Sequence, residues 1–395
     1  MGPGLQTRTG SSESRRVRSD DWDLTTHRAA GIKLPDMSTT TLLTPGRIGG
    51  LQTPNRLMMA PMTRSRALAG GVPSELAIEY YAQRASAGLI ITEGVAPVAV
   101  GLGYARTPTA ETPEQMAAWK KIATAVHERG GRIFMQFMHV GRIGHSANRY
   151  TSEPLVAPSV VRAAGQMWTD AHGLQDLDTP RALDTSEIPG VIDGFAQATR
   201  NALEAGFDGV ELHSASGYLP MQFLSTGTNK RTDGYGGSVQ NRIRFVVEAL
   251  EAMSAAAGDA AKVGIKISPA MPFNDIQDDD PIETYTTLVK AIAPMGLAYL
   301  HVLRTPPIPN IFELLRPLYP GTFAAGGAFD LASGNAALAS GTADYIVFGK
   351  PFTSNPDLAE RFAAGLELTP FDATTFYTPG PKGYTDYLPA SAQSA

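Results

Sequence analysis

The sequence contains no cysteine, and this absence excludes several classes of protein. Without thiols the chain forms no disulfide, and it has no Cys ligands for an iron–sulfur cluster or a structural zinc site. Its 7 histidines are scattered and lack the His-Glu-x-x-His spacing of zinc peptidases. We therefore expect no metal centre.

Charge and long hydrophobic runs are also scarce. Charged residues make up 18% of the chain and the formal net charge is −5, so a nucleic-acid-binding surface is not indicated. The sequence contains no apolar run long enough to span a membrane. Hydrophobic residues still make up 43%, enough for a large core. We expect a cytoplasmic monomer or homodimer that acts on a small molecule.

Residues 1–36 differ in composition from the rest of the chain. They are rich in Ser, Thr, Arg and Gly and lack the apolar stretch of a secretory signal. We interpret them as a disordered N-terminal extension, or as a stretch upstream of a natural start at Met37, with organellar targeting as an alternative. Residues 37–395 are predicted to form a single domain, which is within the size range of one large barrel.

Short apolar segments alternate with helical ones from Arg56 onward. The candidate strands cover residues 56–60, 88–92, 132–137, 209–212, 262–268, 299–302, 322–325 and 345–348. The candidate helices cover residues 74–87, 112–129, 186–205, 241–257, 282–293, 310–319, 331–340 and 356–364. Eight strand–helix pairs in series predict a (β/α)8 TIM barrel. An open doubly wound sheet is the alternative, but its Gly-x-Gly-x-x-Gly fingerprint is absent after the first strand.

The third strand–helix unit contains a long insertion, from about His139 to Asp184. Long structureless connections are uncommon in compact domains, and many of them are lids over active sites. We therefore expect this insertion to cap the catalytic face of the barrel.

The segment at residues 209–218 carries the clearest catalytic pattern. Its apolar strand ends at His213, and Tyr218 follows five residues later. Residues at the carboxyl ends of barrel strands face the bound ligand. A His can donate a hydrogen bond to a carbonyl group and a Tyr can donate a proton. Taken alone, such a pair is more often a strand-end His that is hydrogen-bonded to a backbone carbonyl and a Tyr that is packed on a loop. The residues at the other strand ends are therefore needed to distinguish a catalytic site from this alternative.

Those strand ends indicate a phosphorylated ring. Gly326-Gly327 and Gly349-Lys350 follow the seventh and eighth strands, where barrels commonly bind phosphate. Lys266 lies within an apolar strand, where an unpaired ammonium is costly, so it requires an anion or a barrel carboxylate as partner. Thr63 and Gln136 offer neutral hydrogen-bonding groups for the edge of a heteroaromatic ring. FMN is the cofactor that best fits this set.

At these motifs the sequence resembles the Old Yellow Enzyme family of FMN-dependent ene-reductases. The resemblance extends over roughly residues 42–388, nearly the whole of the predicted domain. The motifs that carry it lie at residues 55–66, 91–94, 136–142, 211–219, 229–238, 348–352, 354–358 and 375–377.

The resemblance implies a cofactor, a reaction and residue roles. FMN would be bound tightly but not covalently, NAD(P)H would reduce it, and the substrate would be the activated C=C bond of an α,β-unsaturated carbonyl compound. His213 would bind the carbonyl oxygen and Tyr218 would protonate the α-carbon. Tyr104 and Tyr377 match aromatic residues that line the substrate pocket. The implied cofactor-binding residues are Pro61, Met62, Thr63, Gly94, Gln136 and Lys266 at the flavin ring and Gly326, Gly327, Gly349 and Lys350 at the phosphate.

Some positions depart from the family pattern. Ser216 stands where Asn is common, so we expect a looser clamp on the substrate carbonyl. Lys266 and Lys350 stand where Arg is frequent, and Lys keeps the charge but loses the bidentate fork. Met138 replaces a Trp of several members and should enlarge the pocket. The loop at residues 231–237 is interpreted as structural.

Two other functions remain open at this point. The same flavin could serve the oxidation or isomerisation of a ring substrate. Alternatively, the chain could be a flavin-binding barrel with weak turnover.

Overall fold

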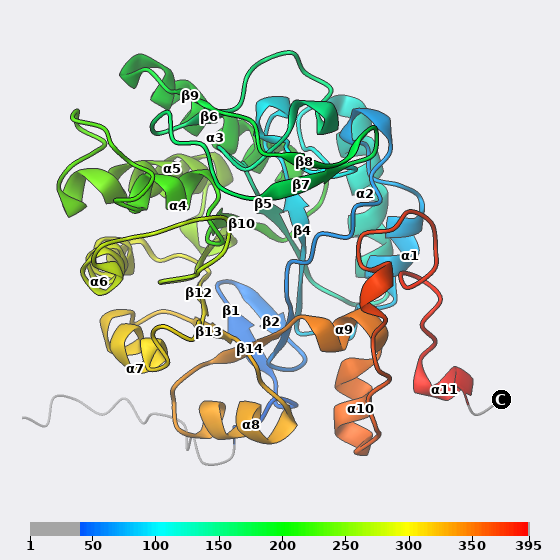
Figure 1. Ribbon diagram of the computed structural model, residues 1–395. Coiled ribbons are helices and arrows are strands. Elements are labelled where there is room, and N and C mark those ends of the chain that lie inside the picture. The colour runs from blue at the N-terminus through cyan, green and yellow to red at the C-terminus, as the bar shows by residue number, and fades with distance from the viewer. Residues whose placement is uncertain (1–39, 394–395) are drawn as a thin grey trace, which may run out of the picture. The chain divides into compact units, whose positions relative to one another are not determined.

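Eight parallel strands close into a barrel in the computed structural model, which describes residues 40–393 (Figure 1). The expectations for residues 1–36 lie outside the described residues, and the domain division at Met37 stays a prediction. Around the ring the strands are β3 (Leu57–Met59), β4 (Leu89–Val95), β5 (Ile133–Phe137), β10 (Gly209–Ser214), β11 (Val263–Ile267), β12 (Tyr299–Leu303), β13 (Phe323–Gly326) and β14 (Tyr345–Phe348). Parallel pairing of β14 with β3 closes the ring, and the predicted (β/α)8 barrel is confirmed.

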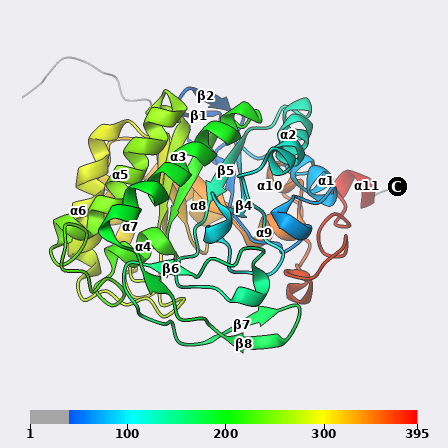
Figure 2. The same ribbon diagram turned by 90° about the horizontal axis from the view of Figure 1, so that it is seen from above.

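Helices surround the strands, with α3, α5 and α6 on one side in the view from above (Figure 2). Those of the described residues are α1 (Leu76–Ala82), α2 (Pro113–Glu128), α3 (Ile188–Glu204), α4 (Leu219–Leu224), α5 (Val239–Ala257), α6 (Pro281–Ile292), α7 (Ile311–Leu315), α8 (Leu331–Ala339), α9 (Lys350–Ser354), α10 (Leu358–Ala364) and α11 (Ala390–Gln393). None of them combines the length and hydrophobicity that a membrane crossing requires.

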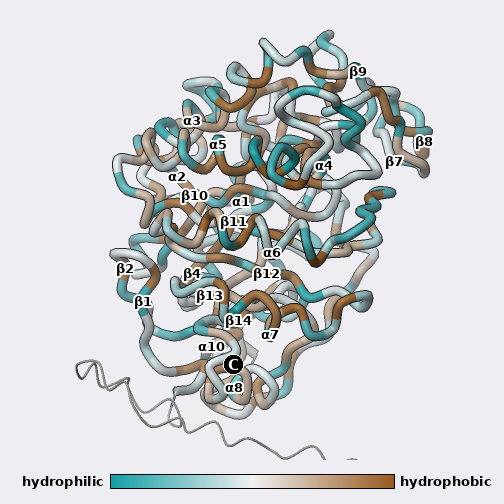
Figure 3. The backbone as a smooth tube through the Cα atoms, turned by 90° about the vertical axis from the view of Figure 1, so that its left-hand side faces the viewer, coloured by the Kyte–Doolittle hydropathy of each residue, from teal (hydrophilic) through white to brown (hydrophobic). Residues whose placement is uncertain are grey.

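The helices form where the sequence provides caps and an apolar face. Thr112 begins α2 with a capping box shared with Gln115, and Gly258 ends α5 in the left-handed conformation with φ 68°. Along α3 the buried residues recur every three or four positions, as on a helix that packs one face on strands. Hydrophobic and hydrophilic stretches alternate accordingly along the tube in Figure 3.

Two predicted helices are shorter than the sequence suggested. The helix expected at residues 310–319 is divided into α7 and a 3-10 turn, Arg316–Leu318, because Pro317 has no amide hydrogen for the helical ladder. The helix expected at 74–87 ends at Ala82, and the amides of Arg84, Ala85 and Ala87 bond three residues back instead of four.

One end of the barrel interior is filled by apolar side chains. The residues that pack there include Met58, Leu89, Ile91, Phe134, Tyr299, Ala324, Tyr345 and Val347. The hairpin of β1 (Gly46–Ile48) and β2 (Leu51–Thr53) joins this cluster through Ile48. Thr53 also shares a hydrogen bond of 2.7 Å with the hydroxyl of Tyr345. The amino-terminal end of the barrel is therefore packed core, which leaves the carboxyl ends of the strands for a site.

The segment between β5 and α3 forms its own small elements. They are β6 (Val156–Ala157), β7 (Gln166–Thr169), β8 (Gly173–Asp176) and β9 (Arg181–Ala182), and the β7–β8 hairpin lies at the rim in Figure 2. Seven apolar residues of the segment form a cluster with Tyr218: Met138, Val140, Ile143, Leu155, Ala163, Met167 and Leu177. The segment thus contacts the tyrosine of the predicted site, while its action as a lid stays a prediction.

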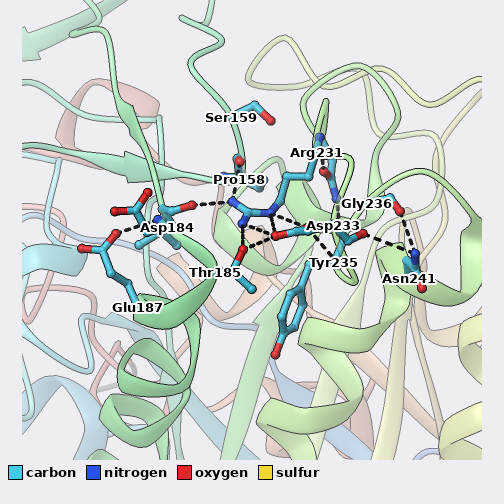
Figure 4. Close-up of polar contacts among 12 residues, drawn as sticks. Pro158, Ser159, Asp184, Thr185, Glu187, Arg231, Asp233, Tyr235, Gly236 and Asn241 are labelled. Atoms are coloured by element: carbon cyan, nitrogen blue, oxygen red, sulfur yellow. Dashed lines mark hydrogen bonds and ion pairs between the residues drawn. The ribbon is translucent and has the colours of Figure 1, made fainter.

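Arg231 joins the loop after α4 to this segment (Figure 4). Its guanidinium forms an ion pair with Asp233 and donates to the carbonyl oxygens of Pro158, at 3.0 Å, and Leu183. Arg231 also donates to the hydroxyl of Thr185 at 3.1 Å. The contacts with Pro158, Leu183 and Thr185 join this loop to the segment between β5 and α3, in keeping with the structural interpretation of the loop.

Candidate active site

Five polar side chains lie inside the carboxyl-terminal half of the barrel. Two of them, Glu211 and His213, are on β10, and they face the same side because side chains alternate along a strand. The strand register places Glu211 beside Gln136 of β5 and His213 beside Lys266 of β11. Lys266 lies in turn beside His301 of β12, and all five side chains are buried. The structure therefore brings three of the predicted site residues, Gln136, His213 and Lys266, to one end of the barrel.

Glu211 is a fully buried carboxylate that holds two neighbours in place. Its Oε1 accepts a hydrogen bond of 2.6 Å from Gln136 Nε2, and its Oε2 lies 3.1 Å from His301 Nδ1. With its amide nitrogen engaged, Gln136 presents a carbonyl oxygen that can accept from a ring N–H. Sequence reasoning assigned no role to Glu211 or His301. Their positions could have indicated a role, because Glu211 and His301 are each a titratable residue within an otherwise apolar strand.

Lys266 is a buried cation with an exposed fraction of only 8%. Within residues 40–393 its ammonium forms neither a hydrogen bond nor an ion pair, so the alternative of a barrel ion pair is not realised. Burial lowers the pKa of Lys266, and the charge of Glu211 opposes that shift. An unpaired buried ammonium is costly, and a bound anion would relieve the cost. The position is therefore suited to an anionic group of a bound ligand, and the resemblance implies that this group is the N1 and C2-oxygen edge of a flavin.

His213 and Tyr218 lie edge to face, with ring centroids 4.8 Å apart. Burial lowers the pKa of His213 well below its usual value, aided by the charges of Lys266 and His301, so the ring is neutral. Its Nδ1 is buried and has no partner within the described part of the chain. Burial, and then Tyr104, raise the pKa of Tyr218 well above its usual value, so the phenol keeps its proton. A neutral imidazole and a protonated phenol thus stand side by side.

Tyr104 completes this group. The hydroxyl of Tyr218 donates to the hydroxyl of Tyr104 at 3.2 Å, and the two rings meet edge to face. Tyr377, the other predicted pocket aromatic, is 62% exposed, and its carbonyl oxygen accepts from Arg106. The structure therefore places Tyr104 in direct contact with Tyr218 and leaves Tyr377 at the surface.

Ser216 adopts a backbone conformation that few residues favour, with φ 56°. Its amide donates to Ser268 Oγ at 2.9 Å, and its carbonyl oxygen accepts from Asn274 Nδ2 at 2.8 Å. Asn274, in the loop after β11, also has a positive φ, of 58°. Sequence reasoning did not identify Asn274, because its contact with Ser216 spans residues far apart in the chain. The available signal was an Asn-Asp pair, Asn274-Asp275, in the loop that follows the strand of Lys266.

The predicted ring-binding residues of β3 and β4 lie at the strand ends. Pro61, Met62 and Thr63 are half-buried, and the Thr63 hydroxyl has no hydrogen bond within residues 40–393. Gly94 lies opposite Gln136 in the strand register. A Cβ atom at Gly94 would come within 2.6 Å of Met138 Sδ, so a larger residue there would require the Met138 side chain to shift.

The predicted phosphate residues lie at the ends of β13 and β14. Gly326 ends β13, and a Cβ atom there would lie 3.0 Å from His301 Nε2, next to the polar group in the barrel. Gly327 follows directly and is exposed. Gly349 precedes α9, and a Cβ atom there would lie 3.7 Å from Met62 Sδ. Lys350 is exposed, with its Nζ 5.5 Å from the centre of the Phe371 ring.

Two arginines of the loop that begins with Thr63 form hydrogen bonds to the C-terminal segment. Arg64 Nη2 donates to the carbonyl oxygen of Gly383 at 2.6 Å. Arg66 Nη2 donates to the carbonyl oxygens of Thr375, at 3.0 Å, and Lys382, at 2.9 Å. Sequence reasoning did not assign this role to either arginine.

Glu93 is buried behind this loop and accepts a hydrogen bond of 3.3 Å from the amide of Arg64. Burial raises the pKa of Glu93 to about 7, although the Arg64 amide and the charges of Arg64 and Arg66 act in the opposite direction. A carboxyl group whose pKa is higher in the folded state binds its proton more tightly there. The free energy of unfolding should therefore fall as the pH rises from about 4.5 through about 7.

We expect Glu93→Gln to remove this pH dependence, because the amide oxygen still accepts from Arg64 but does not ionise. The wild-type protein should lose up to about 3 kcal/mol of stability between pH 5 and 8 relative to Glu93→Gln. Urea unfolding across that range measures the difference. Parallel pH profiles for the two proteins would contradict the prediction.

A TIM barrel with a buried unpaired cation and a protonated tyrosine at the carboxyl ends of its strands suits a flavin-dependent oxidoreductase. Comparison with known proteins leads to the same class. The model of the NADH:flavin oxidoreductase / NADH oxidase family matches residues 41–369.

Related proteins and structures agree with this match. The chain is 42% identical over 372 residues to putative 12-oxophytodienoate reductase 4 of Oryza sativa subsp. japonica, covering 91% of this chain and 94% of the relative. It is 40% identical over 369 residues to 12-oxophytodienoate reductase 1 of the same organism, covering 91% and 95%. Among solved structures, morphinone reductase superposes with a TM-score of 0.86 at 40% identity, covering 91% of this chain and 99% of that one. The Old Yellow Enzyme homologue from Zymomonas mobilis gives a TM-score of 0.85 at 38% identity, covering 88% and 99%.

The chain therefore belongs to the NADH:flavin oxidoreductase / NADH oxidase family, the family of the Old Yellow Enzymes. Its cofactor is FMN and its reductant is NAD(P)H. The predictions of an FMN-dependent oxidoreductase with ene-reductase activity on α,β-unsaturated carbonyl compounds are confirmed.

Proposed function

We propose that the substrate is a ring enone whose carbonyl oxygen is bound by His213 and whose α-carbon is protonated by Tyr218. One observation carries the proposal: a neutral imidazole with an unpartnered buried nitrogen stands 4.8 Å from a phenol that keeps its proton. The names 12-oxophytodienoate reductase and morphinone reductase, borne by relatives of this chain, both denote ketones.

FMN, when bound, would supply the hydride for the β-carbon of the alkene. His213 donates a hydrogen bond to the carbonyl oxygen and so stabilises the negative charge that develops there, an effect of a few kcal/mol for one well-placed donor. Tyr218 gives its proton to the α-carbon, and Tyr104, 3.2 Å away, orients its hydroxyl. The apolar cluster around Tyr218 keeps water from competing as the proton source.

The buried polar group positions the flavin ring. Lys266 would lie beside the N1 edge, and Gln136, held by Glu211, would accept from a ring N–H. Ring contacts would also come from Pro61, Met62, Thr63 and Gly94, and phosphate contacts from Gly326, Gly327, Gly349 and Lys350. The support for this assignment is the unpartnered Lys266 ammonium together with glycines at the ends of two adjacent strands.

We expect His213→Ala to weaken the binding of phenols and enones together, because both depend on the same hydrogen bond to oxygen. Loss of one such bond should raise Kd by roughly tenfold. Titration of the FMN-loaded protein with phenol, followed in the visible flavin spectrum, measures the change. An unchanged phenol Kd would remove His213 from the proposed role.

We expect Ser216→Asn to tighten phenol binding without loss of stability. Asn tolerates a left-handed backbone better than Ser, and φ at this position is 56°. Its longer amide can also reach a ligand oxygen that a hydroxyl does not. The same spectral titration, with a thermal melt, tests both parts, and a lower melting temperature combined with weaker phenol binding would contradict them.

Steady-state oxidation of NADPH in the presence of 2-cyclohexenone tests the function itself. Cyclohexanone should form in proportion to the NADPH consumed. NADPH oxidation without cyclohexanone would instead favour a flavin barrel with weak or different turnover. We further propose a cytoplasmic monomer or homodimer, which sedimentation of the purified chain and localisation of a tagged copy would test.

A further inference from the structure

A cavity of about 200 Å³ lies between α4, α6 and the loop that joins β11 to α6. Most of its wall is apolar and includes Met221, Leu224, Met271 and Ile276. Neither His213 nor Tyr218 lines it. The cavity is therefore distinct from the proposed substrate site, although Met221 Sδ accepts a hydrogen bond from the amide of Gly217 in the turn before Tyr218.

Two polar groups in this wall lack partners. Tyr285, on α6, is 1% exposed, and its hydroxyl has no hydrogen-bond partner within residues 40–393. Asp278 uses Oδ1 to accept from the amide and hydroxyl of Thr226, both at 3.3 Å, while its buried Oδ2 has no partner. Leaving a buried donor or acceptor unsatisfied costs free energy, and an unpaired buried carboxylate oxygen costs more. The two groups share one cavity and both remain available to a ligand.

The negative charge of the cavity wall favours a cationic ligand. No Lys or Arg lines the cavity, and Asp278 forms no ion pair within the described residues. Asp279 and Asp280 follow directly and add negative potential. Burial and the charge of Asp278 raise the pKa of Tyr285 above its usual value, so its hydroxyl is neutral and its oxygen can accept. An ammonium group has three donors and would satisfy both oxygens, while the apolar wall suits a short hydrocarbon body.

We propose that this cavity binds a small primary amine with an apolar body, held through its ammonium group by Asp278 and Tyr285. The site is separate from the enone site, because neither His213 nor Tyr218 lines the cavity. A bound amine and a bound phenol should therefore occupy the protein at the same time.

Calorimetric titration of the FMN-loaded full chain with benzylamine, at constant ionic strength, tests the proposal. The Asp278→Asn protein should bind benzylamine at least about tenfold more weakly, because a charged hydrogen bond is lost. Asp279→Asn is the matched control, since it removes the same charge from the neighbouring exposed residue outside the cavity wall, and its affinity should remain within about twofold of wild type, as for an exposed charge. Benzyl alcohol, which lacks the positive charge, should bind about tenfold more weakly than benzylamine.

Tyr285→Phe gives a second, independent measurement. It should weaken benzylamine binding several-fold without lowering the melting temperature, because the hydroxyl it removes has no partner in the folded protein. Saturating phenol should leave the affinity for benzylamine unchanged.

Several results would overturn the proposal. They are the absence of benzylamine binding, equal binding by wild type and Asp278→Asn, equal binding of benzyl alcohol, and displacement of benzylamine by phenol. If Asp278→Asn does not fold, undiminished benzylamine binding by Tyr285→Phe overturns it alone.

Discussion

Tyr218→Phe should leave flavin reduction by NADPH near its normal rate and slow flavin reoxidation by 2-cyclohexenone by about 10²–10⁴-fold, the range typical of a lost general acid. The tyrosine hydroxyl is the group proposed to protonate the α-carbon, and reduction of the flavin does not require it. The substitution keeps the ring that packs against His213 at 4.8 Å, so the pocket should retain its shape.

Stopped-flow absorbance of the two half-reactions measures this separation. Tyr104→Phe is the matched control, because it removes the partner hydroxyl at 3.2 Å but keeps the proposed acid, and its effect should be much smaller. Nitroalkenes, whose reduced intermediate carries its charge without immediate protonation, should be less affected by Tyr218→Phe. Equal slowing of both half-reactions would mean that the proton comes from another group.

Lys266→Met should weaken FMN binding and stabilise the apoprotein at the same time. In the holoprotein the ammonium is proposed to face the flavin edge, and its loss should raise the Kd for FMN by about tenfold to a hundredfold. In the apoprotein the same ammonium is buried without a partner, so an apolar side chain of similar length should raise the free energy of unfolding by about 1–3 kcal/mol.

Fluorescence titration with FMN and urea unfolding of the apoprotein test the two parts. Lys350→Met is the matched control, because Lys350 is exposed: it should weaken FMN binding but leave the stability of the apoprotein unchanged. Lys266→Arg should keep the affinity for FMN, since the charge is retained. An apoprotein destabilised by Lys266→Met would show that the ammonium has a structural partner in the apoprotein, which would contradict its proposed role as an unpaired cation that binds FMN.

The barrel could be predicted from sequence because its strands are short apolar runs separated by helical periods. All eight predicted strands are present, and the ends of most of them agree to within a residue or two. Three described helices that were not predicted, α4, α9 and α11, are six, five and four residues long, too short to show a helical period. The β1–β2 hairpin was missed for a similar reason, since each strand has three residues and one face is not buried.

The site could be predicted only in part. Gln136, His213 and Lys266 were found because each interrupts or ends an apolar strand, and parallel strands bring such positions together. The partners that fix their environment depend on strand register and on loop paths, which the sequence does not specify. Examples are the contact of Glu211 with His301 across two strands and that of Asn274 with Ser216 across 58 positions.

The cavity beside α6 illustrates the same limit. Asp278 and Tyr285 are seven positions apart, and nothing in their spacing indicates that both would have a buried atom without a partner in one cavity. That property depends on the tertiary packing of α4 against the loop after β11.

An anaerobic titration of the purified protein tests the central claim most directly. The account predicts a yellow protein whose flavin is released as FMN on heating, is bleached by one equivalent of NADPH, and regains its colour on addition of one equivalent of 2-cyclohexenone, with cyclohexanone as the product. A colourless protein that FMN does not reconstitute, or a reduced flavin that cyclohexenone does not reoxidise, would contradict it.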